Sequence, residues 1–143
     1  MKNFVAVLLS IILVAAVSIP AQELTPEKKE AAVNNLTVGV NSDNSGLRAS
    51  SACQIYRLIE DKYLKDADAS KAMIPLLNML ENGTSEDERI AAAVALYKLG
   101  NAIGIYRLRG VALFDSNERV GMICKNLYYT YHKLNNTEYY IDF

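Results

Sequence analysis

The chain has 143 residues, 51% of them hydrophobic and 22% charged, and its formal net charge at pH 7 is −1. That length corresponds to one domain, and the composition argues against a disordered or fibrous protein. The nearly neutral charge argues against a nucleic-acid-binding protein, which needs a concentrated basic surface.

Residues 1–22 have the pattern of a secretory signal peptide. Lys2 is their only charge, an apolar core runs from Phe4 to Val17, and small residues follow it. The core is shorter than the roughly 20 residues of a transmembrane helix. We therefore expect cleavage after Ser18 or after Ala21, which gives an exported, periplasmic or extracellular protein with no membrane span after cleavage.

Residues 23–143 are predicted to form a single all-α domain. The first helix has a typical start, with Thr25 as its N-cap and Pro26 in its first turn. Asp115 and Glu118 provide a D-x-x-E start signal for the last helix. The expected helices cover, in chain order, about 26–37, 45–62, a segment that Asp66 or Asp68 caps and that ends at Glu81, 85–99, 102–114 and 116–133.

The helix predicted for residues 85–99 has the clearest boundaries. Ser85 and Glu88 have the spacing of a capping box, in which each side chain satisfies a backbone N–H group of the other residue. Gly100 follows the last residue and can take the left-handed conformation that ends a helix. Because this helix is apolar on nearly all sides, we expect it to be buried between neighbours, with Ala92 and Leu96 in the core.

A second copy of this helix lies earlier in the chain. Residues 47–58 match residues 88–99, with Arg48 aligned on Arg89 at a spacing of 41. Arg119 restarts the pattern 30 residues after Arg89. The helices that follow also align, and the match places Ile74, Leu77 and Leu80 on Ile105, Leu108 and Val111. The repeating unit is therefore predicted to be a pair of helices, and such pairs bury their apolar faces by stacking.

The pattern Arg89-x-Ala91-Ala92-Ala93-x-Ala95-Leu96-x-x-Leu99-Gly100, followed by a tight turn, resembles HEAT repeats. The resemblance covers roughly residues 45–130, although Glu88 stands where the family usually has Val. The chain is also similar to small secreted bacterial proteins built on such repeats, whose role is not defined.

The resemblance implies a short α-solenoid, in which the second helix of each pair lines the concave side. Members of the family in general bind partners, and one branch is associated with bilin lyases. We expect about two and a half helix pairs, with helix 26–37 capping one end and helix 116–133 the other.

We expect no catalytic residue, metal site or cofactor. Cys53 and Cys124 are interpreted as small buried hydrophobic residues two units apart, too far from each other for a disulfide. A disulfide or a metal site is the alternative. His132 is the only histidine and is expected at the surface or as a cap. Glu86, Asp87 and Glu88 are explained as dipole-compensating residues of a helix start.

Arg48, Arg89 and Arg119 recur in the first turn of their helices, where a positive charge opposes the helix dipole. Their structural interpretation is a contact with a neighbouring carboxylate or loop carbonyl. The alternative is a ladder of anion-binding groups.

The candidate partner-binding residues lie on the second helices and at the tyrosine-rich end of the chain. The first group would form a small polar groove, and the tyrosines an interface patch. These candidates are Lys71, Asn78, Tyr106, Arg107, Arg109, Tyr131, Tyr139 and Tyr140. The expected function is non-catalytic binding or scaffolding of an unidentified protein or peptide. An enzyme or ligand-handling protein of the bilin-lyase type and a structural component of the cell envelope are the alternatives.

Overall fold

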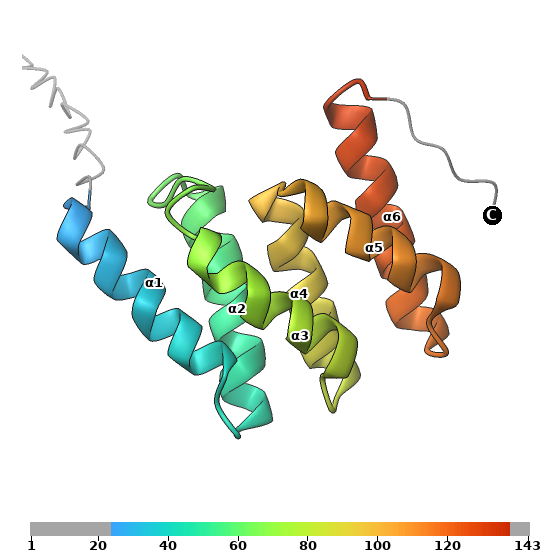
Figure 1. Ribbon diagram of the computed structural model, residues 1–143, viewed down its shortest axis with the longest axis horizontal. Coiled ribbons are helices and arrows are strands. Elements are labelled where there is room, and N and C mark those ends of the chain that lie inside the picture. The colour runs from blue at the N-terminus through green and yellow to red at the C-terminus, as the bar shows by residue number, and fades with distance from the viewer. Residues whose placement is uncertain (1–23, 138–143) are drawn as a thin grey trace, which may run out of the picture.

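The computed structural model describes residues 24–137 (Figure 1). These residues form six α-helices and a short 3₁₀ helix, η1, and contain no strand. The elements are α1 (Pro26–Val40), α2 (Ser45–Glu60), η1 (Ser70–Ala72), α3 (Met73–Asn82), α4 (Glu86–Leu99), α5 (Ala102–Phe114) and α6 (Glu118–Leu134). The predicted signal peptide, residues 1–22, lies outside the described residues, and so do Tyr139 and Tyr140.

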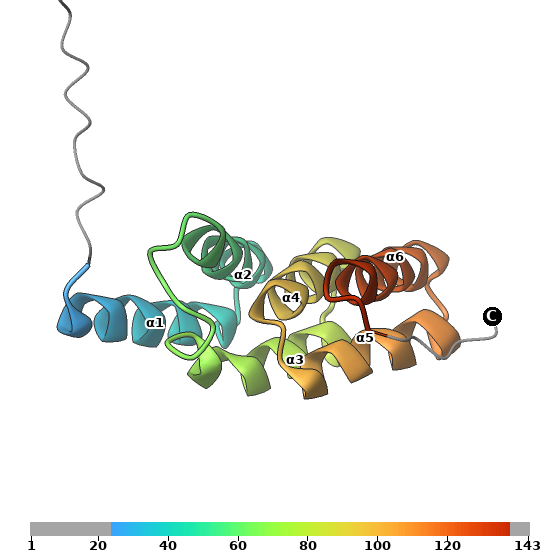
Figure 2. The same cartoon turned by 90° about the horizontal axis from the view of Figure 1, so that it is seen from above.

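The helices are arranged in two layers, which confirms the all-α, repeat-like fold. Helices α1, α3 and α5 form one layer, and α2, α4 and α6 form the other (Figure 2). Each helix of the first layer packs extensively on the helix that follows it, so the chain folds as the hairpins α1–α2, α3–α4 and α5–α6. The expected pairing was different, since it joined α2 to α3 and left α1 as a cap. Helix α1 packs on α2 and lies at one end of the layer that also holds α3 and α5 (Figure 2).

Helix α4 occupies the predicted central position. It packs against α2 and α6 within its own layer and against α3 in the other layer. Ala92, Ala93, Ala95 and Leu96 are completely inaccessible to solvent. The small alanine side chains allow the neighbouring helices to approach closely, which explains why one helix can be buried on several sides.

Several helix ends follow the sequence signals. The Ser85 hydroxyl accepts a hydrogen bond from the Glu88 N–H group at 3.2 Å, and Gly100 ends α4 with a φ of 62°. Thr25 and Asn101 cap α1 and α5.

Two predicted caps are wrong. Asn117, not Asp115, caps α6, because its side-chain oxygen accepts the Val120 N–H hydrogen bond at 3.0 Å. Neither Asp66 nor Asp68 caps a helix: η1 and α3 have no side-chain cap, and Asp68 accepts a hydrogen bond from the Lys65 N–H group instead.

The caps also correct the register of the third copy. Arg48 lies four residues after its N-cap Asn44, and Arg89 lies four residues after Ser85. Four residues after Asn117 the chain has Gly121, so Arg119 is not equivalent to the other two arginines.

The alignment of the second helices shifts as well. Ile74 is 65% exposed, whereas Ile105, its predicted counterpart, is 4% exposed. The burial pattern pairs Ile74 with Ile103, which is 54% exposed, and Leu76 with Ile105. The true counterparts in α3 and α5 are therefore two residues closer in sequence than predicted: Ile74 and Ile103 both face solvent, and Leu76 and Ile105 are both buried.

The central burial of α4 leads to a first prediction. Ala92→Asp places an unpaired carboxylate where no water reaches, which costs several kcal/mol, so we expect the variant to unfold or to melt far below the wild type. Ala31→Asp is the control, because Ala31 is exposed on α1 and surface substitutions change stability by only about 0.5 kcal/mol or less. The measurement is thermal unfolding followed by circular dichroism. Equal melting of both variants would contradict the position of α4.

Candidate functional site

A buried ion pair joins α2 to α4. The side chain of Glu88 is completely inaccessible to solvent, and its Oε1 atom lies 2.6 Å from Nη2 of Arg48. Arg48 also donates to the Ser42 carbonyl at 2.7 Å, and the Thr84 N–H group donates to Oε2 of Glu88 at 2.9 Å. The second half of the predicted capping box is therefore absent, because the Glu88 carboxylate binds Thr84 and Arg48 instead of the Ser85 N–H group.

The surroundings of Glu88 keep it ionised. Burial alone would raise the pKa of its carboxyl group, but hydrogen bonds from Ser45, from Arg48 and from the Thr84 N–H group, together with the positive charge of Arg48, outweigh burial and hold the pKa below the ordinary value of 4.5. A buried carboxylate that is charged and fully hydrogen-bonded serves the structure and is not available as a proton donor.

Arg89 makes the equivalent connection from α4 to the loop between α5 and α6. It forms a two-pronged pair with the Asp115 carboxylate and donates from Nε to the Leu80 carbonyl at 2.8 Å. The hydrogen bonds from Arg89 and from the Asn117 N–H group hold the pKa of Asp115 below its ordinary value, although burial opposes them. Asp115, predicted as a helix cap, is thus the partner of an arginine.

Arg119 pairs in the opposite direction along the stack. Its exposed guanidinium lies 2.5 Å from the carboxylate of Glu86 in α4. All three arginines therefore contact carboxylates, and two of them also bind loop or helix-end carbonyls, as the structural interpretation expected. Because their charges are already neutralised, they do not offer a free ladder of cations to an anion.

The residues of the predicted polar groove do not meet in one groove. Lys71 pairs with Glu30 at 2.8 Å and lines a hollow of about 360 Å³ beside α1. Asn78 lines a separate hollow of about 220 Å³ at the loops that join α1 to α2 and α3 to α4. Arg107 pairs with Glu81 at 3.3 Å and lines a third hollow of about 310 Å³ near the end of α5.

Large apolar side chains on the outer side of α3 and α5 are exposed instead. Tyr106, a predicted binding residue, is 65% exposed, and its exposed apolar neighbours were not among the predicted binding residues. Ile103, Tyr106 and Phe114 recur at helical spacing on one side of α5, and Phe114 is 84% exposed. Ile74 occupies the place of Ile103 on α3. We call these four residues the apolar face. An alignment that paired Ile74 with Ile103 would have found them.

Two other predicted binding residues, Tyr131 and Arg109, are partly buried. The Tyr131 hydroxyl donates to the Gly100 carbonyl at 3.1 Å, which ties the end of α6 to the turn between α4 and α5. Arg109 is half-buried, and its Nε atom has no hydrogen-bond partner among the described residues. Neither side chain joins the apolar face.

The two cysteines are unpaired, and they differ in exposure. Cys53 is exposed, which contradicts the prediction that it is buried. Cys124 is buried as predicted, and its burial raises the pKa of the thiol to about 12 from the ordinary 9.0.

His132 is half-buried against the ring of Tyr128, with the ring centres 4.4 Å apart. Within residues 24–137, no set of three or more His, Cys, Asp or Glu side chains is grouped as metal ligands would be.

No helix in the described part of the chain is long and apolar enough to cross a membrane. Comparison with known proteins gives no match, either to a protein-family model, to a curated protein or to a solved structure. The function must therefore be inferred from the residues themselves.

The buried pair gives a second prediction. Glu88→Gln leaves the charge of Arg48 without its partner. Breaking a buried pair costs about 3–5 kcal/mol, and because Arg48 is partly exposed we expect about 2–3 kcal/mol at pH 7. Glu81→Gln is the control, since its pair with Arg107 is exposed and contributes little. The measurement is urea unfolding. An equal loss of unfolding free energy in both variants would contradict the expectation that the buried pair matters more than the exposed one.

The same variant has a pH signature. Because the pKa of Glu88 is lowered from 4.5 in the folded chain, its carboxylate contributes stability above that pH, and the contribution is lost as the pH falls through the lowered pKa. The wild type should therefore lose more unfolding free energy than Glu88→Gln between pH 6 and pH 3. A steeper loss in the variant would contradict this assignment.

The cysteines give a third prediction. A thiol reagent at pH 8 should modify Cys53 alone in the native protein and should modify Cys124 only after denaturation, because a buried thiol with a raised pKa is protected from attack. The measurement is thiol titration with and without denaturant under non-reducing conditions. The absence of any reactive thiol in denaturant would show that a disulfide forms instead.

Proposed function

We propose that this chain is an exported, non-catalytic helical-repeat protein of the HEAT-like type that binds a protein or peptide through its apolar face. The exposed side chains of Ile74, Ile103, Tyr106 and Phe114 carry the proposal. Large apolar side chains exposed on one side of a folded domain are typical of an interaction site, and Tyr and Phe are enriched in the cores of interfaces. The signal-peptide pattern of residues 1–22 supports the exported location.

The position of the apolar face supports recognition of an extended or helical segment. Its residues lie on α3 and α5, two neighbouring helices of one layer (Figure 2), and Arg107 and Glu81 provide charged groups between the same two helices. An apolar strip with a charged rim suits an amphipathic partner segment, which buries its own apolar residues and keeps its polar side in water.

The side chains that could take part in catalysis already contact other side chains, which supports a role without catalysis. Glu88 and Asp115 are each held by an arginine, and His132 packs against the ring of Tyr128. A nucleophile, a base and an orienting group in mutual contact are the minimum for most hydrolytic chemistry. A ligand-handling function is the second candidate, and the hollow of about 360 Å³ beside α1 favours it.

Site-specific photo-crosslinking gives the fourth prediction. A photoreactive residue in place of Tyr106 should give one major product of defined mass when the full chain is produced and its exported fraction is irradiated. The same residue in place of Met122 is the matched control, because Met122 is 58% exposed but lies on α6 in the other layer. Once the protein or peptide in the crosslinked product is identified and purified, Ile103→Ser should weaken its binding at least tenfold and Met122→Ser less than twofold.

Two results would overturn the proposal. Equal crosslinking at the two positions, or none at Tyr106, would show that the apolar face is not a specific interface. A small molecule that co-purifies with the chain in the absence of any protein partner would favour the ligand-handling alternative.

A further inference from the structure

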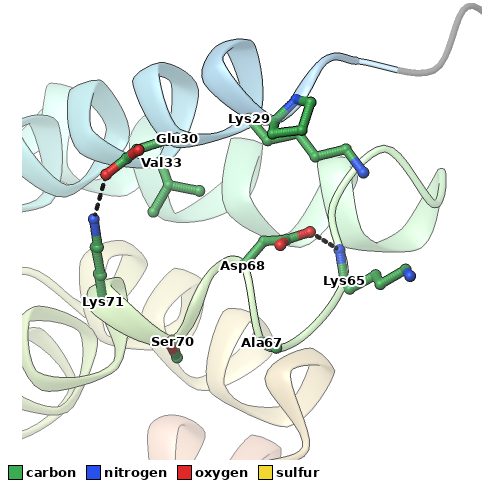
Figure 3. A pocket seen from close by; sticks show the side chains of 9 residues that line it. Lys29, Glu30, Val33, Lys65, Ala67, Asp68, Ser70 and Lys71 are labelled. Atoms are coloured by element: carbon green, nitrogen blue, oxygen red, sulfur yellow. Dashed lines mark hydrogen bonds and ion pairs between the residues drawn. The ribbon is translucent and has the colours of Figure 1, made fainter.

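A hollow of about 360 Å³ lies between α1 and the connector that joins α2 to η1, residues 61–69. Lys29, Glu30 and Val33 project into it from α1 (Figure 3). Lys65, Asp68 and Lys71 line the other side, from the connector and η1. The two walls come from parts of the chain about 40 residues apart, so the hollow is a product of the fold.

The connector is fixed in position although it contains no α-helix. Leu64 is 2% exposed in the core, and its N–H group donates to the Leu58 carbonyl at 2.9 Å. Ala69 is completely buried at the other end of the connector. Between them, the Asp68 carboxylate accepts a hydrogen bond from the Lys65 N–H group at 2.9 Å. This anchoring fixes the backbone of the wall that carries Lys65 and Asp68 before any ligand arrives, which lowers the cost of binding.

Some charged groups of the hollow have a partner within the described part of the chain and others do not. The Glu30 carboxylate is paired with Lys71 at 2.8 Å, and the Asp68 carboxylate is engaged by the backbone of Lys65. The ammonium groups of Lys29 and Lys65 have no carboxylate partner among the described residues. The side chain of Lys29 is half-buried, whereas Lys65 is exposed. The lining therefore holds three ammonium groups against two carboxylates, a net charge of +1, and two of its lysines have no ion-pair partner within residues 24–137.

We propose that this hollow binds a small soluble phosphomonoester, with Lys29 and Lys65 holding the phosphate group. Lysine binds phosphate as a point charge and needs no two-pronged geometry, and no arginine lines the hollow. A phosphomonoester carries nearly two negative charges at pH 7, and it would supply the counter-charge that Lys29 and Lys65 lack among the described residues. The Ser70 hydroxyl lines the same hollow as a further polar group.

The apolar part of the lining accounts for an organic group on the phosphate. Pro26, Val33 and Ala67 supply apolar surface beside the lysines. The volume of about 360 Å³ falls at the lower end of the range for small-molecule sites, about 300–1,000 Å³, and exceeds what a bare phosphate requires. The fit is therefore to a compact molecule such as a phosphorylated three- or four-carbon compound.

Calorimetric titration tests the proposal and gives the fifth prediction. The purified mature chain is titrated with glycerol 3-phosphate, and separately with inorganic phosphate and with succinate, at one ionic strength maintained with sodium chloride. We expect saturable binding of glycerol 3-phosphate at one site, and at least tenfold weaker binding of succinate. The double variant Lys29→Met/Lys65→Met should weaken the binding of glycerol 3-phosphate at least tenfold.

The matched control removes the same charge from the same elements. Lys28 lies beside Lys29 on α1, Lys62 lies on the connector with Lys65, both are exposed, and neither lines the hollow. Lys28→Met/Lys62→Met should therefore bind glycerol 3-phosphate within twofold of the wild type. Circular dichroism melting establishes that both double variants remain folded.

Several results would overturn the proposal. These are the absence of saturable binding, equal weakening in the two double variants, or tighter binding of succinate than of glycerol 3-phosphate. A further arm uses phosphatidylcholine vesicles that contain phosphatidic acid, and binding to these vesicles alone would contradict a soluble ligand. The hollow and the apolar face share no residue, so Tyr106→Ser should leave phosphate binding unchanged, and either proposal can fail without the other.

Discussion

The contact between Arg48 and Glu88 is the constraint on which the arrangement of the second layer depends. The carboxylate is fully buried, so α4 can pack on α2 only in the register that brings the guanidinium to it. An ion pair between Glu60 and Lys98 ties the other ends of the same two helices. A well-packed apolar pair could be as stable, but it would tolerate sliding of one helix past the other. We infer that the buried pair specifies the register.

The third copy of the repeat also has an arginine–carboxylate pair, but different residues form it. Val120 occupies the place in α6 that Glu88 has in α4, so Arg89 has no carboxylate at that position. Asp115 supplies it from two residues before the cap of α6. This substitution explains why sequence alone misassigned Asp115: an aspartate near a helix start is a plausible cap, and only the position of an arginine 26 residues earlier decides otherwise. Glu88 was misjudged for the same reason.

Local signals were sufficient for most of the fold. The apolar pattern of α4, the cap Ser85 and the left-handed Gly100 are properties of adjacent residues, and they located the central helix. Local signals did not predict which exposed residues lie next to one another. Lys71, Asn78 and Arg107 share a layer but line different hollows, since solvated side chains carry no periodic signal that fixes their neighbours. Cys53 shows the limit of the repeat itself, because it aligns with partly buried Val94 yet faces solvent.

The hairpin arrangement has a consequence for the order in which the chain folds and opens. Each substantial helix contact joins α-helices that are neighbours or next neighbours along the chain, so few long loops must close before contacts form, and folding of such chains is fast. Helix α4 contacts both of its neighbours in the layer, α2 and α6, and we expect it to belong to the folding nucleus. The connector of residues 61–69 is the boundary between the α1–α2 hairpin and η1, while the contact of α2 with α4 and the Arg48–Glu88 pair hold that hairpin to the rest. The lysine-lined hollow lies at that boundary, and a ligand bound there would lower the frequency of its opening.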